Sequence, residues 1–415
     1  MHHRRQRLVL HILTKSFPAF NLLTSHWKQS FLALPHLSTS SPSRLVPFRL
    51  AHGESTPHID SVVHCFNMIS AAGCGMRIWY SLVGMCFALT LIAATQSPVS
   101  GQWSVPRTSD GHPDLQGNWT NVTITPFQRR EGREPVFTWE EVAELEGREA
   151  DLRVRTSQAS DPNRPPPEVR SDPGGYNYIY IDRGTQVAIV NGEPRTSLLT
   201  DPPNGRRPPL TAEGQRRVEA RREFRSQFGT YDNPENRPLG ERCIVSFGTS
   251  AGPPMIPNNF YNNNYTIVQT SHHVMIMSEM VHDVRIIPIG EPQTMRKDVR
   301  PWFGNSWGRW EGDVLVVETT NINPQQTIRG VPPSEDALVI ERLSRADEET
   351  ILYEFTIDDP TMWTERWGGQ IPINKFDARL YEYACHEGNY SLAGVLSGAR
   401  YEERMEAQGA SDSRR

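Results

Sequence analysis

The chain has 415 residues, with 43 Lys and Arg against 48 Asp and Glu and a formal net charge of −5. From residue 102 onward, 35 basic residues face 46 acidic residues. Binding to nucleic acid requires concentrated positive charge, so we expect no nucleic-acid partner. That part of the chain contains no phosphate-binding loop, no Rossmann glycine pattern and no Cys-x-x-Cys. We therefore expect no cofactor.

Residues 76–101 have the three parts of a secretory signal peptide. Arg77 gives a basic start, residues 78–94 form an apolar core, and the stretch ends with Val99-Ser100-Gly101. An uncleaved membrane anchor is the alternative, because the apolar core approaches the ~20 residues that span a bilayer. Polar residues interrupt this core and no stop-transfer charges follow it. We expect cleavage, export to the periplasm or the exterior, and no stable membrane span after processing.

Residues 1–75 are basic and rich in histidine, and their only acidic residues are Glu54 and Asp60. They show no periodicity long enough to predict a folded element. An organellar transit segment is one interpretation. The other is a translation start placed too early, which the signal-like sequence beginning at Met76 favours. We interpret residues 1–75 as an unstructured leader or a misplaced start.

The cysteine count agrees with export. Cys243 and Cys385 are the two cysteines beyond residue 101. An even number in an oxidising compartment predicts one disulfide, although two separate buried thiols would give the same count.

Residues 102–257 read as an irregular region with two helices and a short hairpin. Thr138 and Glu141 form a capping box that predicts a helix over residues 138–153. A second helix is expected over residues 211–228, with Thr211 at its N-cap. Its arginines indicate either a solvated face or a face for an anionic partner. The hairpin is expected over residues 176–190, turning at residues 182–184.

Residues 258–400 predict a β-meander. Residues 265–290 are rich in β-branched side chains and indicate two or three strands. Residues 302–320 and 337–358 each alternate around a turn and predict hairpins. Two more strands are expected over residues 364–373 and 380–385, before a polar tail at residues 401–415. The fold class is therefore mainly β, an antiparallel meander curled into a lipocalin-like up-and-down barrel or a bent sheet, with two early helices.

Four long blocks carry a resemblance to a known group of proteins: GERCIVSFG at 240–248, EMVHDVRIIPIG at 279–290, GRWEGDVLVVETTN at 308–321 and LYEYACHEGN at 380–389. They resemble an uncharacterised family of exported, β-rich bacterial proteins. The resemblance implies an exported β-rich domain and implies no catalytic residues.

The segment NNFYNNNY at 258–265 combines asparagines with aromatic rings, as a site for a polar ligand such as a sugar does. A loop of left-handed turns would also use Asn. We expect a small amphipathic or sugar-like ligand near this segment. The expected ligand-binding residues are Arg242, Asn259, Tyr261, Asn263 and Tyr265.

A hydrolase or lyase is the alternative function. His386 and Glu387 follow the last expected strand, and a histidine beside a carboxylate can transfer protons. Glu279 and Asp283 are expected to assist them. A structural His at a hairpin corner is the simpler interpretation. Residues 272–283 also contain three histidines, but without the usual spacing of metal ligands, so we expect no metal site.

Overall fold

The computed structural model describes residues 103–159, 162–163, 181–246, 251–258, 260–292 and 294–412. The chain divides into one unit at Met1–Gln102 and another at Trp103–Arg415. All described residues belong to the second unit, so the predicted leader and signal peptide lie outside them. Among the helices of the described residues, none is both long and apolar enough to cross a membrane.

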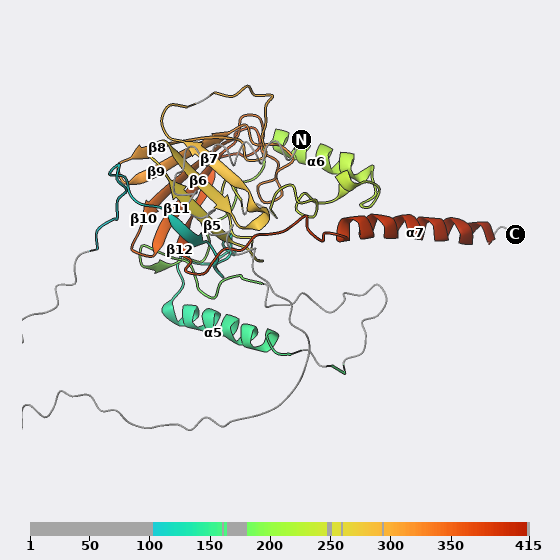
Figure 1. Ribbon diagram of the computed structural model, residues 1–415, viewed down its shortest axis with the longest axis horizontal. Coiled ribbons are helices and arrows are strands. Elements are labelled where there is room, and N and C mark those ends of the chain that lie inside the picture. The colour runs from blue at the N-terminus through green and yellow to red at the C-terminus, as the bar shows by residue number, and fades with distance from the viewer. Residues whose placement is uncertain are drawn as a thin grey trace, which may run out of the picture. The chain divides into compact units, whose positions relative to one another are not determined.

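Ten strands of the described chain form one sheet that curls into a nearly closed barrel (Figure 1). Nine of them follow the order β7-β6-β5-β1-β12-β11-β10-β9-β8, and β4 pairs with β12 beside this path. These nine strands are β1 (Gly117–Thr120), β5 (Asn264–Gln269), β6 (His273–Ser278), β7 (Val284–Pro288), β8 (Asn305–Glu311), β9 (Val314–Thr320), β10 (Leu338–Arg345), β11 (Thr350–Asp358) and β12 (Trp367–Lys375). This sheet confirms the mainly β, barrel-like fold expected from the sequence.

The alternating sequence of the strands determines which side chains face the interior. In β11, Ile351, Tyr353, Phe355 and Ile357 are all buried, and the residues between them are half-buried. Successive side chains of a strand point to opposite faces, so an apolar residue at every second position gives one buried face. The hairpins β8–β9 and β10–β11 turn where the sequence predicts them.

Strand β1 closes the ring between the two ends of the meander. It pairs with β5 on one side and with β12 on the other, both antiparallel. Trp119 in β1 is buried, its Nε1 donates to Leu115 O at 2.9 Å, and the Arg345 guanidinium lies 5.2 Å from its ring centroid. Trp119 therefore anchors β1 in the core.

The ring is joined least tightly between β7 and β8. The described chain shows a single bridge there, a parallel one between Ile289 and Gly308, supplemented by the bond from Gly290 N to Gly308 O at 2.9 Å. Residues 289–304 connect the two strands. Parallel strands need a connection of about a dozen residues or more, which agrees with the length of this segment.

Residues 251–257, the core segment, pack inside the ring although the segment is rich in Gly and Pro. All seven residues are buried. Met255 N donates to Tyr353 Oη at 2.8 Å, Asn121 Nδ2 donates to Met255 O at 3.3 Å, and Gln326 Nε2 donates to Gly252 O at 2.9 Å. A buried loop needs partners for its backbone groups, and side chains of the barrel supply several of them.

A charged pair lies next to the core segment. Arg285 of β7 and Glu341 of β10 occupy inward-facing positions with side-chain exposures of 3% and 1%. Arg285 Nη1 donates to Glu341 Oε1 at 2.9 Å, and Tyr353 Oη donates to the same oxygen at 2.7 Å. Burial lowers the pKa of Arg285, but the attraction of Glu341 outweighs it, and the pKa lies above its usual value. Arg285 therefore stays protonated in the core, where its guanidinium binds the Glu341 side chain.

The helices of the described chain lie outside the ring (Figure 1). The helices are α5 (Trp139–Thr156), α6 (Ala212–Ser226) and α7 (Ser391–Asp412), and the 3-10 turns are η2 (Pro234–Asn236) and η3 (Met280–His282). The capping box of Thr138 and Glu141 and the N-cap at Thr211 are both present. The two early helices expected from the sequence are thus confirmed.

The structure differs from the expected strands in three places. Residues 380–385 are irregular rather than a strand, and β12 is the last strand along the described chain. The small hairpin of the described chain consists of β2 (Ile189–Val190) and β3 (Glu193–Pro194) and turns at Asn191-Gly192, whereas the first strand of the hairpin expected to turn at residues 182–184 lies largely outside the described residues. Both turn residues have positive φ, which the Asn-Gly pair tolerates best. Strand β4 (Leu199–Asp201) has no counterpart in the sequence prediction.

Candidate functional site

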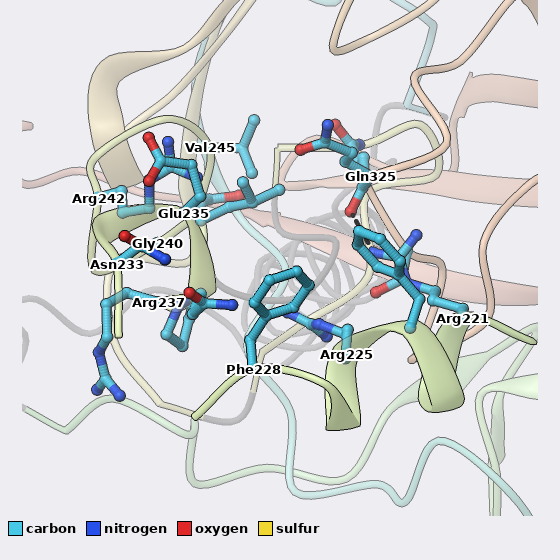
Figure 2. A pocket seen from close by; sticks show the side chains of 17 residues that line it. Arg221, Arg225, Phe228, Asn233, Glu235, Arg237, Gly240, Arg242, Val245 and Gln325 are labelled. Atoms are coloured by element: carbon cyan, nitrogen blue, oxygen red, sulfur yellow. Dashed lines mark hydrogen bonds between the residues drawn. The ribbon is translucent and has the colours of Figure 1, made fainter. Parts of the chain in front are cut away.

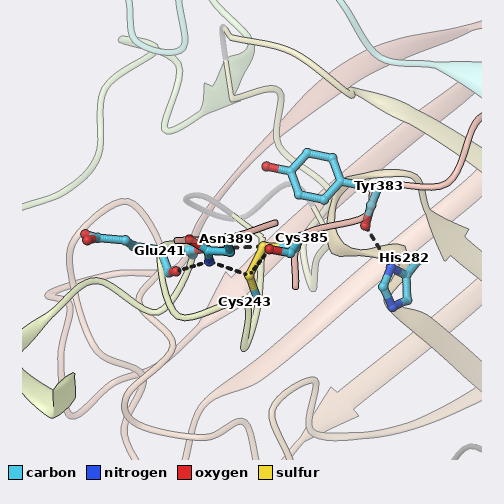
Figure 3. Close-up of a disulfide and its surroundings, with 7 residues drawn as sticks. Glu241, Cys243, His282, Tyr383, Cys385 and Asn389 are labelled. Carbon is cyan, nitrogen blue, oxygen red and sulfur yellow. Dashed lines mark hydrogen bonds between the residues drawn. A yellow bond between two sulfur atoms is a disulfide. The ribbon is translucent and has the colours of Figure 1, made fainter. Parts of the chain in front are cut away.

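The predicted disulfide between Cys243 and Cys385 is present. Its surroundings join three distant segments (Figure 3). Asn389 Nδ2 donates to Glu241 O at 3.2 Å, and the His282 ring Nδ1 lies 3.2 Å from Tyr383 O. The cross-link therefore fixes the loop before Cys243 to the segment that leads into α7.

A pocket of about 770 Å³ lies beside this cross-link (Figure 2). We call it the arginine-rich pocket, because Arg221, Arg225, Arg237 and Arg242 line it. One wall is formed by α6 and the turn after it, the other by the loop at residues 233–246, and residues 325–327 complete it. Arg221, Phe224, Arg225 and Phe228 line the first wall. Their spacing of three and four residues places them on one face of a helix.

Contacts with the barrel hold α6 in place. Arg217 pairs with Glu335 at 2.8 Å, and Arg221 Nη1 donates to Pro324 O at 2.8 Å. Gly214 lies so close to the chain that a Cβ there would meet Met362 O at 2.4 Å. These contacts hold α6 against the barrel from Gly214 to Arg221, at the start of the first wall of the pocket.

The opposite wall is held by its own bonds as well as by the disulfide. Arg237 pairs with Glu241 at 2.7 Å, and its guanidinium lies 4.8 Å from the ring centroid of Tyr231. Cys243 has a positive φ of 55°, an uncommon backbone state for a residue with a side chain. The wall is thus a constrained loop, whose geometry the cross-link maintains.

The pocket carries an excess of positive charge. In the part of the chain that the structure describes, Arg221, Arg225 and Arg242 have no carboxylate within ion-pair distance, whereas Arg237 is neutralised by Glu241. Burial, and then the charge of Arg225, lower the pKa of Arg221. Glu235 is the one acidic residue that lines the pocket. An anionic group would relieve this like-charge repulsion.

Aromatic rings supply the apolar part of the pocket. Phe224 and Phe228 are both exposed and meet edge to face, with their ring centroids 5.4 Å apart. In Figure 2 the ring of Phe228 points from the end of α6 toward the middle of the pocket. Exposed rings beside guanidinium groups that have no carboxylate partner among the described residues suit a molecule with an apolar body and a negative group.

Among the expected ligand-binding residues, Arg242 lines this pocket, whereas Tyr261, Asn263 and Tyr265 do not. Asn263 is buried and its Nδ2 donates to Asp182 O at 3.2 Å, while the buried Tyr265 Oη accepts from Asn121 Nδ2 at 3.0 Å. Tyr261 stacks against Tyr383, with centroids 6.4 Å apart. Asn259 lies outside the described residues. The aromatic and asparagine-rich segment thus supports the fold.

The expected catalytic residues fall in two places. Glu279 and Asp283 flank the turn between β6 and β7, where Glu279 Oε2 accepts from Asn264 Nδ2 at 2.7 Å. Burial raises the pKa of Asp283 to about 7, although a hydrogen bond with the backbone of Ser246 opposes this effect. Ser246 lines the arginine-rich pocket. Asp283 therefore lies directly behind one wall of it.

His386 and Glu387 are both exposed in the turn that follows the disulfide, where Asn389 N donates to His386 O at 3.3 Å. Neither residue lines the arginine-rich pocket, and the structure does not bring them together with Glu279 or Asp283 at one described cavity. Within the described residues, no group of three or more His, Cys, Asp and Glu side chains is placed to hold a metal ion.

Residues 248–252 read Gly-Thr-Ser-Ala-Gly, which matches the Gly-x-Ser-x-Gly of serine hydrolases. That motif requires a strand before it and a helix after it, whereas here Gly252 leads into Pro253 and Pro254 of the buried core segment. Ser250 itself lies outside the described residues. The pattern therefore does not form the strand–turn–helix elbow.

No family model, curated protein or solved structure matches the chain. The sequence had indicated Arg242 and a basic helix from residue 211. It did not reveal that Phe224 and Phe228 share a face with Arg221 and Arg225, although their spacing carries that signal.

Proposed function

We propose that the protein is an exported binding protein for a small amphipathic molecule that carries an anionic group. The observation that carries this proposal is the arginine-rich pocket, where three arginines without carboxylate partners face an exposed pair of phenylalanines. The disulfide supports export to an oxidising compartment, the periplasm or the exterior. The resemblance of four sequence blocks to exported bacterial proteins supports the same compartment.

The pocket offers binding groups for both the anionic part and the apolar part of such a ligand. Its volume of about 770 Å³ lies within the ~300–1,000 Å³ of small-molecule sites. Guanidinium groups bind carboxylate, sulfonate or phosphate oxygens through paired, charge-assisted hydrogen bonds. The phenyl rings pack against an apolar chain or ring, so the anionic and the apolar part of the ligand are both removed from water on binding.

A fluorescent pair of dyes tests the proposal. Anilinonaphthalene sulfonate is an amphipathic anion, and phenylnaphthylamine is a similar molecule without the charge. We expect the full-length protein to bind the sulfonate more tightly. Arg225→Gln and Arg242→Gln should each weaken this binding about tenfold, which corresponds to ~1.4 kcal/mol for a partly exposed charge-assisted bond. Neither substitution should change the binding of the neutral dye.

Arg222→Gln is the matched control, because Arg222 is an exposed arginine of α6 that does not line the pocket. If Arg222→Gln weakens binding as much as Arg225→Gln, the effect is one of net charge and the proposed site is wrong. The hydrolase or lyase alternative has no comparable support, because His386 and Glu387 do not line this pocket.

A further inference from the structure

A second pocket, of about 740 Å³, lies on the outer side of the barrel against α5. Its floor includes Leu352 of β11 and Pro372 of β12, and its sides are the first half of α5 and the β2–β3 hairpin. Val142 is the one buried residue of α5. A helix with so narrow an apolar stripe does not cover the sheet fully, and the space that remains is the pocket.

One wall is held by a specific bond. Glu146 Oε1 accepts from Val187 N at 3.0 Å, which ties α5 to the irregular segment that leads into the hairpin. The hairpin tip is the tight Asn191-Gly192 turn, with φ angles of 54° and 79°. Both sides of the pocket are therefore fixed in place without a ligand.

The apolar surface of this pocket is unusually open to solvent. Trp139, at the first position of α5, is 61% exposed, and Ile189 of the hairpin is 44% exposed. A helix start does not require a tryptophan, and an exposed indole offers a flat face on which a ring can stack. The pocket thus has a stacking platform above an apolar floor.

The polar groups of this pocket differ in charge from those of the arginine-rich pocket. Among the described residues that line it, two are acidic, Glu146 and Asp347, and none is Lys or Arg. Neither carboxylate has a basic side chain within ion-pair distance in the described part of the chain. Side-chain amides that both donate and accept hydrogen bonds are also present, from Gln186, Asn191 and Asn374.

We propose that this second pocket binds a carbohydrate without acidic groups. The C–H face of a sugar ring stacks on Trp139, while its hydroxyl groups donate to the carboxylates and exchange hydrogen bonds with the amides. Two carboxylates without a cation repel uronic or sulfated sugars. The inference is independent of the anionic ligand, because the two pockets share no lining residue.

Titration calorimetry of the full-length protein with a panel of disaccharides tests this proposal. The neutral probes are cellobiose, maltose and diacetylchitobiose, the cationic probe is the glucosamine disaccharide, and the acidic probe is digalacturonate. We expect at least one neutral or cationic sugar to bind, with digalacturonate at least tenfold weaker. Trp139→Ala should weaken binding at least tenfold, and Trp139→Phe should retain most of it, since a flat ring remains.

Trp103→Ala is the matched control, because Trp103 is an exposed tryptophan that lines neither pocket. It should leave sugar binding unchanged, as should Arg225→Gln. Three results would overturn the proposal: no binding of any neutral or cationic sugar at millimolar concentration, equal binding of digalacturonate, or an unchanged affinity in Trp139→Ala. Binding of an alkyltrimethylammonium ion without binding of any sugar would also overturn it, and would assign the pocket to cations.

Discussion

The buried pair of Arg285 and Glu341 gives the sharpest prediction about the fold. Replacing Glu341 with Leu removes the acceptor of both short bonds of the Arg285 guanidinium. Of its hydrogen bonds to described residues, the long ones to Ser306 Oγ at 3.4 Å and Thr319 Oγ1 at 3.5 Å would remain. A buried charge left without its partner costs about 3–5 kcal/mol. Arg285→Met leaves Glu341 with Tyr353 Oη as its donor and should cost a similar amount.

The double replacement separates the pair interaction from burial. When both charges are removed together, no uncompensated charge remains, so Arg285→Met with Glu341→Leu should destabilise less than either single change. The coupling between the two sites should therefore exceed about 3 kcal/mol. Urea unfolding followed by tryptophan fluorescence measures each variant, with the midpoint and the slope reported separately.

An exposed ion pair serves as the control. Arg296 and Asp298 have side-chain exposures of 81% and 62%. Arg296→Met should change the unfolding free energy by less than about 1 kcal/mol, as surface ion pairs do. A cost below 1 kcal/mol for Glu341→Leu, or a double variant as unstable as the sum of the two singles, would show that the pair is not desolvated and that the barrel interior is misplaced.

Three further predictions concern the strands, the pH dependence and the cross-link. Phe355→Ala should cost about 3–5 kcal/mol in a urea melt as a buried aromatic truncation, and Glu354→Ala much less; equal effects would mean a wrong register. The raised pKa of Asp283 means that the folded state holds its proton more tightly, so this stabilisation is complete below pH ~4 and is lost as the pH rises through about 7. It amounts to at most about 4 kcal/mol, and Asp283→Asn should be more stable than the parent at pH 8, a result whose absence would contradict the burial of this carboxyl. Cys243 and Cys385, 142 residues apart, should be found linked by non-reducing mass spectrometry. Reduction should remove up to about 5 kcal/mol in the chain-entropy model, and an unchanged melting temperature would contradict that estimate.

The sequence predicts those features whose cause is local. The period-two pattern around Tyr353 and the capping box at Thr138 each involve residues close in the chain, and both were predicted correctly. The disulfide could be predicted because only two cysteines were left to pair. Residues 380–385 also alternate, but the barrel is already complete without them, and Tyr381 stays exposed. Alternation alone therefore overestimates the number of strands.

The sequence does not predict the features that depend on contacts between residues far apart in the chain. Residues 251–257 look like an exposed loop, because Gly and Pro dominate them. They are buried since Tyr353 and Gln326, 98 and 74 residues away from their bonding partners, satisfy their backbone groups. The same holds for the candidate site. Arg242 could be identified, but the wall opposite it comes from α6, and no local pattern states which helix face meets which loop.

The strand count has a consequence for how the ring can close. Nine strands arranged in a closed ring cannot all run opposite to both of their neighbours, because complete alternation of strand direction requires an even number of strands. One adjacent pair must run in the same direction, and here it is β7 and β8, linked by one parallel bridge. The remaining eight junctions of this ring are antiparallel. A further strand inserted between β7 and β8 would run antiparallel to both, and every neighbouring pair in the ring would then be antiparallel. A strand inserted at any other junction would leave β7 and β8 parallel and would add a second parallel pair.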